Sequence, residues 1–300
     1  MAPLPTERKP IMTIIVTGAT GHLGRLTVEA LRKRGVPAAS IRALGRSAER
    51  LAPLAAQGIE TAVIDFDKPE TLEPAFAGAD AMLLVSSSEI GQRARQHGNA
   101  IEAAKRAGVG RLVYTSVFHA TETDGVLSPE HAATERLLAE SGLPVTILRN
   151  NLYTETYADQ VGIASMTGEV VASAGAGRVA SASRKDYAEA AAAVLTAEGH
   201  EGAVYELSGD AAWTFTELAA VARDLLGREI AYRPVTPEQH RQILLGAGLD
   251  EGTAGFVVAL DGDIRDGGFA EVTPTLSELI GRPTTPLAQG IADARTEAVA

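Results

Sequence analysis

The sequence predicts an α/β protein built on a doubly wound parallel sheet. Short β-branched runs alternate with amphipathic helical patterns through the first half of its 300 residues, and the first run ends in a glycine-rich turn. Strands separated by helices of this length need right-handed crossovers, which produce a parallel sheet covered on both faces. Predicted strands cover residues 11–16, 41–44, 61–64, 81–85, 112–115 and 145–148, and helices cover 48–57, 69–76, 91–107 and 129–141.

The glycine-rich turn after the first strand predicts a binding site for a dinucleotide. Residues 17–24 read TGATGHLG, and a helical pattern follows them. The first glycine permits the tight turn, the second lets the backbone approach a pyrophosphate, and the third lets the helix pack on the strand. The helix N-terminus adds free N–H groups and a partial positive charge. We therefore predict a Rossmann-type fold, and a site formed by Gly18, Ala19, Thr20, Gly21, His22, Leu23 and Gly24; a plain glycine-rich turn is the alternative.

After about residue 150 the pattern loosens. Residues 172–183 are rich in Gly, Ala and Ser, and 203–207 form one more predicted strand that returns to the main sheet. Helical patterns occupy 186–197, 214–226, 237–245 and 276–280. We expect a Rossmann domain over 1–150 and a smaller, mostly helical substrate lobe over 151–300 that is not fully separable. Ligands of open α/β sheets bind outside the carboxyl ends of the strands, so the active site is expected in the cleft beneath this lobe.

Composition narrows the classes of function. The net charge is −11 with a pI near 5.1, so attraction to the phosphates of nucleic acid is not expected. The absence of cysteine excludes disulfides and thiolate chemistry and fits a cytoplasmic protein. Residues 1–10 lack the apolar core of a signal peptide and are expected to be a short leader. No apolar run approaches the length that inserts into a membrane.

The residues after the second, third and fourth strands indicate which dinucleotide binds. The second strand ends in Arg46 without a carboxylate, and a guanidinium suits the 2′-phosphate of NADP. Arg50 lies one turn into the next helix and can assist; a solvated Arg46 is the alternative. Asp65 and Phe66 are expected beside the adenine, and Ser86, Ser87 and Ser88 beside the ribose and pyrophosphate, although ordinary strand-end turns explain both stretches equally well.

Several longer stretches carry a family resemblance. They are the turn at 17–24, the run SSSEIGQRARQHGNAIEAAKRAGV at 86–109, YTS at 114–116, LRNNLYTETY at 148–157 and GHEGAVYELSGDAAWTFTELA at 199–219. In these the chain resembles the NmrA-like atypical short-chain dehydrogenases, especially the branch of type 2 NAD(P)H:quinone oxidoreductases and triphenylmethane dye reductases. The resemblance implies NADPH lying across the sheet, and cofactor contacts from Gly18 to Leu23, Arg46, Ser86 to Ser88, and the loop of Asn150, Asn151, Leu152 and Tyr153, with Thr115 nearby.

The chain departs from orthodox short-chain dehydrogenases because no tyrosine is followed four residues later by a lysine. A ketone needs an acid at its oxygen, whereas a quinone yields a weakly basic hydroquinone anion. The departure therefore favours a quinone or cationic dye, positioned by Asn150, Asn151 and Tyr153, with Tyr157 and Thr115 as lesser candidates.

One helix offers a candidate proton donor. His131 and Glu135 share a face at i, i+4, so His131 can donate a proton while Glu135 orients it; a solvated helix face is the alternative. A metal site of His119, His131 and Glu135 is not expected, because no second close-spaced ligand pair supports it.

The leading hypothesis is an NADPH-dependent oxidoreductase that transfers hydride directly to a quinone, without flavin or metal. A redox-sensing regulator of the NmrA-like kind, binding the dinucleotide without turnover, is one alternative. A reductase of dyes, ketones or imines on the same scaffold is another. The expected partner is a small quinone-like molecule, and the chain is expected to be a monomer or homodimer.

Overall fold

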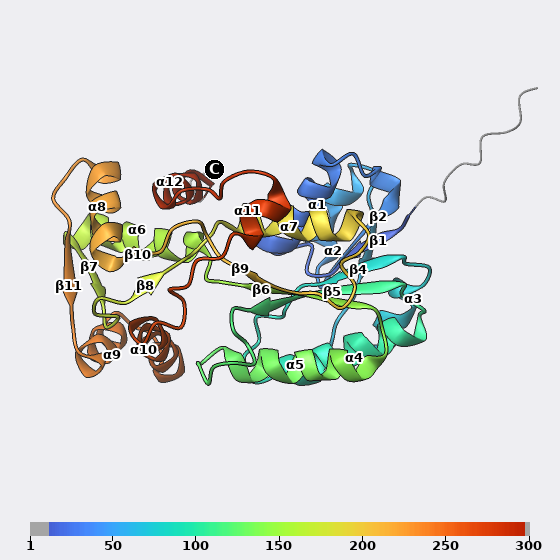
Figure 1. Ribbon diagram of the computed structural model, residues 1–300, viewed down its shortest axis with the longest axis horizontal. Coiled ribbons are helices and arrows are strands. Elements are labelled where there is room, and N and C mark those ends of the chain that lie inside the picture. Colours follow the sequence, from blue (N-terminus) through green and yellow to red (C-terminus); the bar gives the residue numbers. More distant parts are fainter. Residues whose placement is uncertain (1–11, 298–300) are drawn as a thin grey trace, which may run out of the picture.

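A seven-stranded parallel sheet forms the centre of the molecule (Figure 1). The computed structural model describes residues 12–297, so the predicted leader at 1–10 lies outside the described residues. The strands run in the order β3-β2-β1-β4-β5-β6-β9, which confirms the doubly wound prediction. Their bounds are β1 (Ile14–Val16), β2 (Ile41–Gly45), β3 (Glu60–Val63), β4 (Ala81–Leu84), β5 (Arg111–Val117), β6 (Val145–Asn150) and β9 (Val204–Leu207). The strand order reverses between β1 and β4, the switch point at which such sheets bind ligands.

Helices cover both faces of the sheet (Figure 1). One face carries α1 (His22–Lys33), α2 (Ala48–Ala55), α7 (Arg184–Thr196) and α11 (Thr275–Ile280); the other carries α3 (Leu72–Phe76), α4 (Arg93–Arg106) and α5 (Ser128–Ser141). Short 3-10 turns lie at Ala38–Ser40, Pro69–Thr71 and Thr154–Tyr157. Because β9 pairs with β6 and α7 packs on α1, segments from the second half of the chain complete the sheet and its cover.

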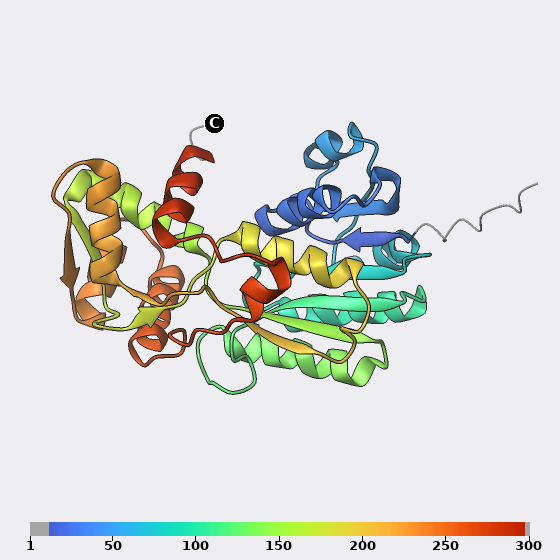
Figure 2. The same ribbon diagram turned by 45° about the horizontal axis from the view of Figure 1, so that its top comes forward.

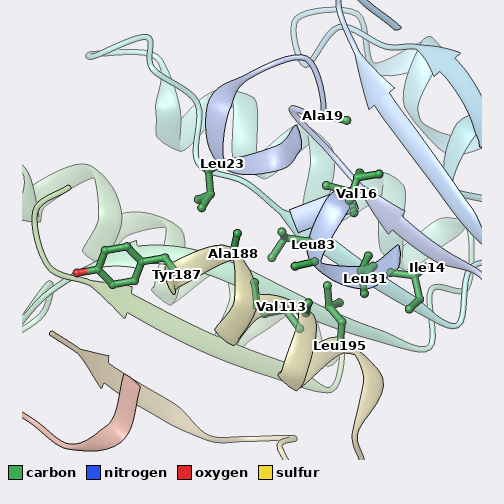
Figure 3. Close-up of a cluster of buried hydrophobic side chains, with 14 of the residues drawn as sticks. Ile14, Val16, Ala19, Leu23, Leu31, Leu83, Val113, Tyr187, Ala188 and Leu195 are labelled. Carbon is green, nitrogen blue, oxygen red and sulfur yellow. The ribbon is translucent and has the colours of Figure 1, made fainter. Parts of the chain in front are cut away.

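Alternating strand residues supply a separate core on each face. Ile14 and Val16 point into the cluster under α1 and α7, while Ile15 between them points into the cluster under α3, α4 and α5. Figure 3 shows the first cluster, in which Leu31 of α1 and Leu195 of α7 meet the strand side chains. Both faces of the sheet are therefore buried, which explains why the strand sequences are nearly continuous runs of apolar residues.

The remaining segments form a lobe beyond the carboxyl ends of the strands, toward which the arrow of β1 points in Figure 2. Its helices are α6 (Ala158–Thr167), α8 (Phe215–Leu226), α9 (Pro237–Gly246), α10 (Glu251–Arg265) and α12 (Leu287–Glu297). They surround two small sheets, in which β7 (Glu169–Ala172) pairs with β11 (Ala231–Pro234), and β8 (Arg178–Val179) pairs with β10 (Trp213–Thr214).

The lobe is helical as predicted, but the sequence reasoning missed its four short strands and helices α6, α10 and α12. The strands are two to four residues long, too short to show a period of two, and β8 lies inside the Gly/Ala/Ser-rich segment. The division of the chain near residue 150 stays a prediction. Within residues 12–297 no helix combines the length and apolar character needed to cross a membrane.

Candidate active site

A cavity of about 540 Å³ opens above the carboxyl ends of β1, β2, β3 and β4. This volume falls within the range of small-molecule and cofactor sites. Fourteen of the residues named from the sequence line it: Gly18, Thr20, Gly21, His22, Leu23, Gly24, Arg46, Arg50, Asp65, Phe66, Ser86, Ser87, Ser88 and Tyr153. The walls also contain residues that the sequence reasoning did not place there: Gly45, Ile64, Val85, Glu89, Arg93, Gln96 and Arg184.

The glycine loop has the geometry of a phosphate cradle. Gly18 adopts φ +60°, a conformation that favours glycine. A Cβ on Gly24 would lie 2.3 Å from the Gly18 carbonyl oxygen, so only glycine lets α1 pack this closely on the loop. Gly21 caps α1 without a side-chain hydrogen bond, and the first turn of the helix has no acidic residue. The N–H groups of that turn are therefore available to an anion at the cavity floor.

The cavity edge beside β2 carries positive charge. Arg46 has a side chain that is 69% exposed, and its Nη1 forms an ion pair with Oε1 of Glu89. Arg50, in α2, donates from Nη2 to the Thr20 carbonyl oxygen at 2.7 Å, which ties α2 to the glycine loop. Both arginines line the cavity, but only the Arg50 guanidinium is hydrogen-bonded to the backbone of the glycine loop.

Buried side chains hold the backbone of the Ser86–Ser88 loop. The Ser86 N–H donates to Thr115 Oγ1 at 2.9 Å, and the Ser87 N–H donates to His97 Nε2 at 3.0 Å. Arg93 Nε donates to the Ser87 carbonyl oxygen at 2.6 Å. Thr115 thus supports the loop rather than lining the cavity. Ser87 lines the cavity, and its hydroxyl is buried and has no hydrogen-bond partner among the described residues.

His97 is a neutral acceptor in this arrangement. Burial, aided by the charge of Arg93, lowers the pKa of His97 to about 4. Because Nε2 accepts from the Ser87 N–H, the ring proton lies on Nδ1, which is 2.9 Å from Thr134 Oγ1. The loop geometry therefore depends on an uncharged imidazole.

Tyr153 and Arg184 close the end of the cavity nearest the lobe. Tyr153 follows β6, and Arg184 opens α7 directly after its N-cap Ser183. The Arg184 guanidinium carbon lies 4.8 Å from the centroid of the Tyr153 ring, a cation–π contact. Burial raises the pKa of Tyr153, while a hydrogen bond from Asn150 and the charge of Arg184 oppose that rise. Tyr153 is therefore a protonated hydroxyl, able to donate a hydrogen bond.

Other predicted loop residues lie in the protein interior. Asn150 is buried, and its Oδ1 has no partner among the described residues. Asn151 donates from Nδ2 to the Phe269 carbonyl oxygen at 3.2 Å, and its Oδ1 accepts from the Leu152 N–H at 2.7 Å. The Leu152 side chain packs on the lobe core. Ala19 and Tyr157 are likewise core residues, with Tyr157 against Trp213.

His131 and Glu135 do not form a solvated helix face, because both are buried. His131 Nδ1 lies 2.8 Å from the Tyr114 hydroxyl, and burial, aided by the charge of Arg93, lowers the pKa of His131 to about 3. Neither residue lines the cavity. The position of His131 thus gives no support to a role as proton donor, and that role stays a prediction.

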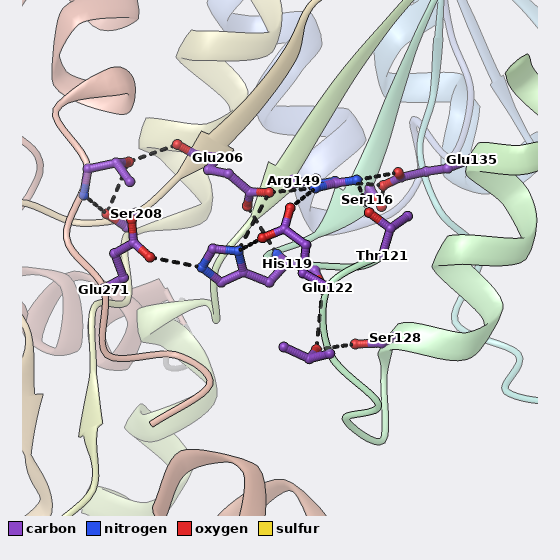
Figure 4. Close-up of polar contacts among 12 residues, drawn as sticks. Ser116, His119, Thr121, Glu122, Ser128, Glu135, Arg149, Glu206, Ser208 and Glu271 are labelled. Atoms are coloured by element: carbon purple, nitrogen blue, oxygen red, sulfur yellow. Dashed lines mark hydrogen bonds and ion pairs between the residues drawn. The ribbon is translucent and has the colours of Figure 1, made fainter. Parts of the chain in front are cut away.

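A second polar cluster lies at the carboxyl ends of β5, β6 and β9 (Figure 4). Arg149 donates to Glu135 at 2.8 and 3.0 Å, to Glu206 at 2.7 Å and to Glu122 at 3.0 Å. His119 has Nδ1 3.0 Å from Glu122 and Nε2 3.1 Å from Glu271, which precedes α11. Arg149 supplies a positive charge to the carboxylates of Glu122, Glu135 and Glu206. The contact between His119 and Glu271 then ties the strand ends to the lobe.

Comparisons with known proteins agree with this geometry. Residues 18–198 match the family described as NAD(P)H-binding. The chain belongs to this NAD(P)H-binding family. Quinone oxidoreductase 2 of Escherichia coli is 44% identical over 278 residues, which are 93% of this chain and 97% of that protein.

Two solved structures of NAD(P)H-binding proteins superpose on nearly the whole chain. The E. coli NADPH-dependent quinone oxidoreductase in complex with NADPH has a TM-score of 0.91 at 43% identity, covering 94% of this chain and 99% of that one. The Citrobacter sp. triphenylmethane reductase in complex with NADP(H) has a TM-score of 0.90 at 37% identity, covering 94% and 100%.

Proposed function

We propose that the protein is an NADPH-dependent oxidoreductase that transfers a hydride to a quinone. The observation that carries the proposal is the cavity at the sheet's switch point, where an uncapped helix N-terminus and a glycine cradle meet the cation of Arg46. The relation to quinone oxidoreductase 2 supports the same reaction and acceptor class.

The residues of the cavity suit the parts of NADPH. We assign the pyrophosphate to the glycine loop and the first turn of α1, and the 2′-phosphate to Arg46 assisted by Arg50. Asp65 and Phe66 lie where the adenine is expected, and the Ser86–Ser88 loop takes the ribose, with the unpartnered Ser87 hydroxyl as one contact. Bound NADPH supplies the hydride.

Tyr153 and Asn150 are the positioning groups that we assign to the acceptor. Tyr153 lines the cavity and is a neutral hydroxyl that can donate, and the buried Asn150 hydrogen-bonds Tyr153 from the protein interior. Arg184 lies over the Tyr153 ring and fixes its orientation. A quinone oxygen gains only a weakly basic charge on reduction, so a hydrogen bond donated by the Tyr153 hydroxyl suffices without a strong acid.

The experiment follows NADPH oxidation with a simple quinone, against a blank without enzyme. Tyr153→Phe removes the donor but keeps the ring, so it is expected to lower kcat with little change in NADPH affinity. Tyr205→Phe is a matched control, since Tyr205 hydrogen-bonds His200 at 2.8 Å outside the cavity. NADPH binding without turnover of any quinone or dye contradicts the proposal and favours a redox sensor.

The proposal includes the setting of the reaction. We propose direct transfer without flavin or metal, in the cytoplasm, by a monomer or homodimer in which the lobe of residues 151–300 covers the acceptor. A visible spectrum without a flavin band, and activity that withstands a chelator, are the expected results. Sedimentation measures the oligomeric state.

A further inference from the structure

The ion pair between Arg46 and Glu89 places a carboxylate where a second negative charge must enter. Arg46 follows β2, and Glu89 lies in the loop after β4, 43 positions along the chain. Both line the cavity, so the pair spans its mouth beside the edge where adenosine is expected. Glu89 therefore neutralises the cation to which the 2′-phosphate of NADPH is assigned.

The Glu89 carboxylate is held in this place from both sides. Its Oε1 pairs with Arg46, and its Oε2 accepts from Gln96 Nε2 at 2.8 Å. Gln96 is buried in α4, and its amide also donates to Asp67 Oδ2 at 3.2 Å. Asp67 in turn pairs with Arg95 at 2.7 Å. Glu89 is thus a fixed part of the cavity edge rather than a freely moving surface side chain.

The chemistry of this edge differs for the two dinucleotides. A carboxylate that accepts hydrogen bonds from the adenosine ribose is the usual mark of an NAD site, and the end of β2 lacks one here. Glu89 supplies that carboxylate from another strand's loop. The 2′-phosphate of NADPH instead needs Arg46 and is repelled by Glu89, because like charges at such an edge oppose each other.

We propose that Glu89 sets the choice between NADPH and NADH, by competing with the 2′-phosphate for Arg46 and by accepting hydrogen bonds from the ribose of NADH. The inference rests on the proposed function, because it needs adenosine at this edge of the cavity. Arg46 then favours NADPH, and Glu89 reduces the size of that preference.

The test compares Glu89→Gln with wild type by titrating the fluorescence of NADPH and NADH. The variant is expected to bind NADPH about threefold more tightly, the size typical of an exposed ion pair, and NADH about threefold more weakly. The fragments 2′,5′-ADP and ADP, which differ only in the 2′-phosphate, are expected to shift in the same two directions. The gain for NADPH is expected to shrink at high salt, because exposed charges are screened.

Glu169→Gln is the control, because it removes the same charge from an exposed pair, Arg233–Glu169, in the lobe. It is expected to change neither affinity. If Glu89→Gln weakens the binding of both coenzymes equally, the substitution has loosened the loop. If it leaves both affinities unchanged, Glu89 has no part in the selection. Either result overturns this inference and leaves the proposed function standing. Wild type that binds neither coenzyme overturns the proposed function as well.

Discussion

Replacing Gly24 with alanine tests the close packing on which the cofactor site depends. The added Cβ would lie 2.3 Å from the Gly18 carbonyl oxygen, 2.6 Å from the Gly18 carbonyl carbon and 2.9 Å from Ala19 Cα. All three are backbone atoms, so no side chain can rotate away. Reaching the 3.0 Å limit of real contacts requires α1 and the loop to separate by roughly 0.7 Å. Overpacking of this kind costs about 1–3 kcal/mol of unfolding free energy, and alanine's higher helix propensity returns at most about 1 kcal/mol.

The displacement moves the N–H groups that are assigned to the pyrophosphate. Binding sites tolerate roughly 0.5 Å of misplacement, so we expect NADPH affinity to fall by about tenfold or more. Urea unfolding measures the stability, and fluorescence titration measures the affinity.

Gly98→Ala is the matched control within a helix. There the new Cβ lies 3.6 Å from Leu137 Cδ1, an ordinary contact, so stability is expected to rise by up to about 1 kcal/mol with NADPH affinity unchanged. If Gly24→Ala behaves like this control in both measurements, the close approach of α1 to the loop is not what shapes the site.

Three further outcomes are expected. Arg46→Ala should lower the affinity for NADPH by about tenfold, since it removes a charged partner of the 2′-phosphate, and lower the affinity for NADH less than twofold. Equal losses of affinity in a titration would show that Arg46 does not bind the 2′-phosphate. His131→Ala should lower the unfolding free energy by about 1–3 kcal/mol, because the buried Tyr114 hydroxyl loses its partner, while kcat stays within about twofold; a selective fall in kcat would restore a catalytic role. Burial lowers the pKa of His97 to about 4 and of His131 to about 3 from 6.5, so below pH 6.5 the unfolded chain takes up protons that the folded chain does not. The contribution of each neutral histidine is therefore complete above pH 6.5, and the free energy of unfolding falls by up to about 1.4 kcal/mol per pH unit and per histidine as the pH drops toward 4. Urea midpoints that stay level across this range would contradict this expectation. So would a dependence of the unfolding free energy on pH that is unchanged in His131→Ala.

The parts of the site that lie within one short segment were predictable. The glycine loop, the serines after β4 and Arg46 after β2 are each tied to a strand end, and a parallel sheet brings all its carboxyl ends to one edge. A local pattern is then enough to place them in the cavity.

The parts that depend on contact between distant segments were not predictable. Arg184 reaches Tyr153 only because α7 returns to cover the sheet, and His131 is buried because α5 packs its face against Tyr114. The spacing of His131 and Glu135 correctly predicts one face of a helix, but periodicity does not say whether a polar face meets water or another polar residue.

The sequence by itself determined the α/β class, the parallel direction of its first strands and the glycine turn, because each follows from local periodicity and from the stereochemistry of glycine. Only the tertiary structure decided which charges face one another. It paired Arg46 with Glu89 and set Arg149 among three glutamates, since charge pairing depends on distances of a few ångströms between residues far apart in the chain.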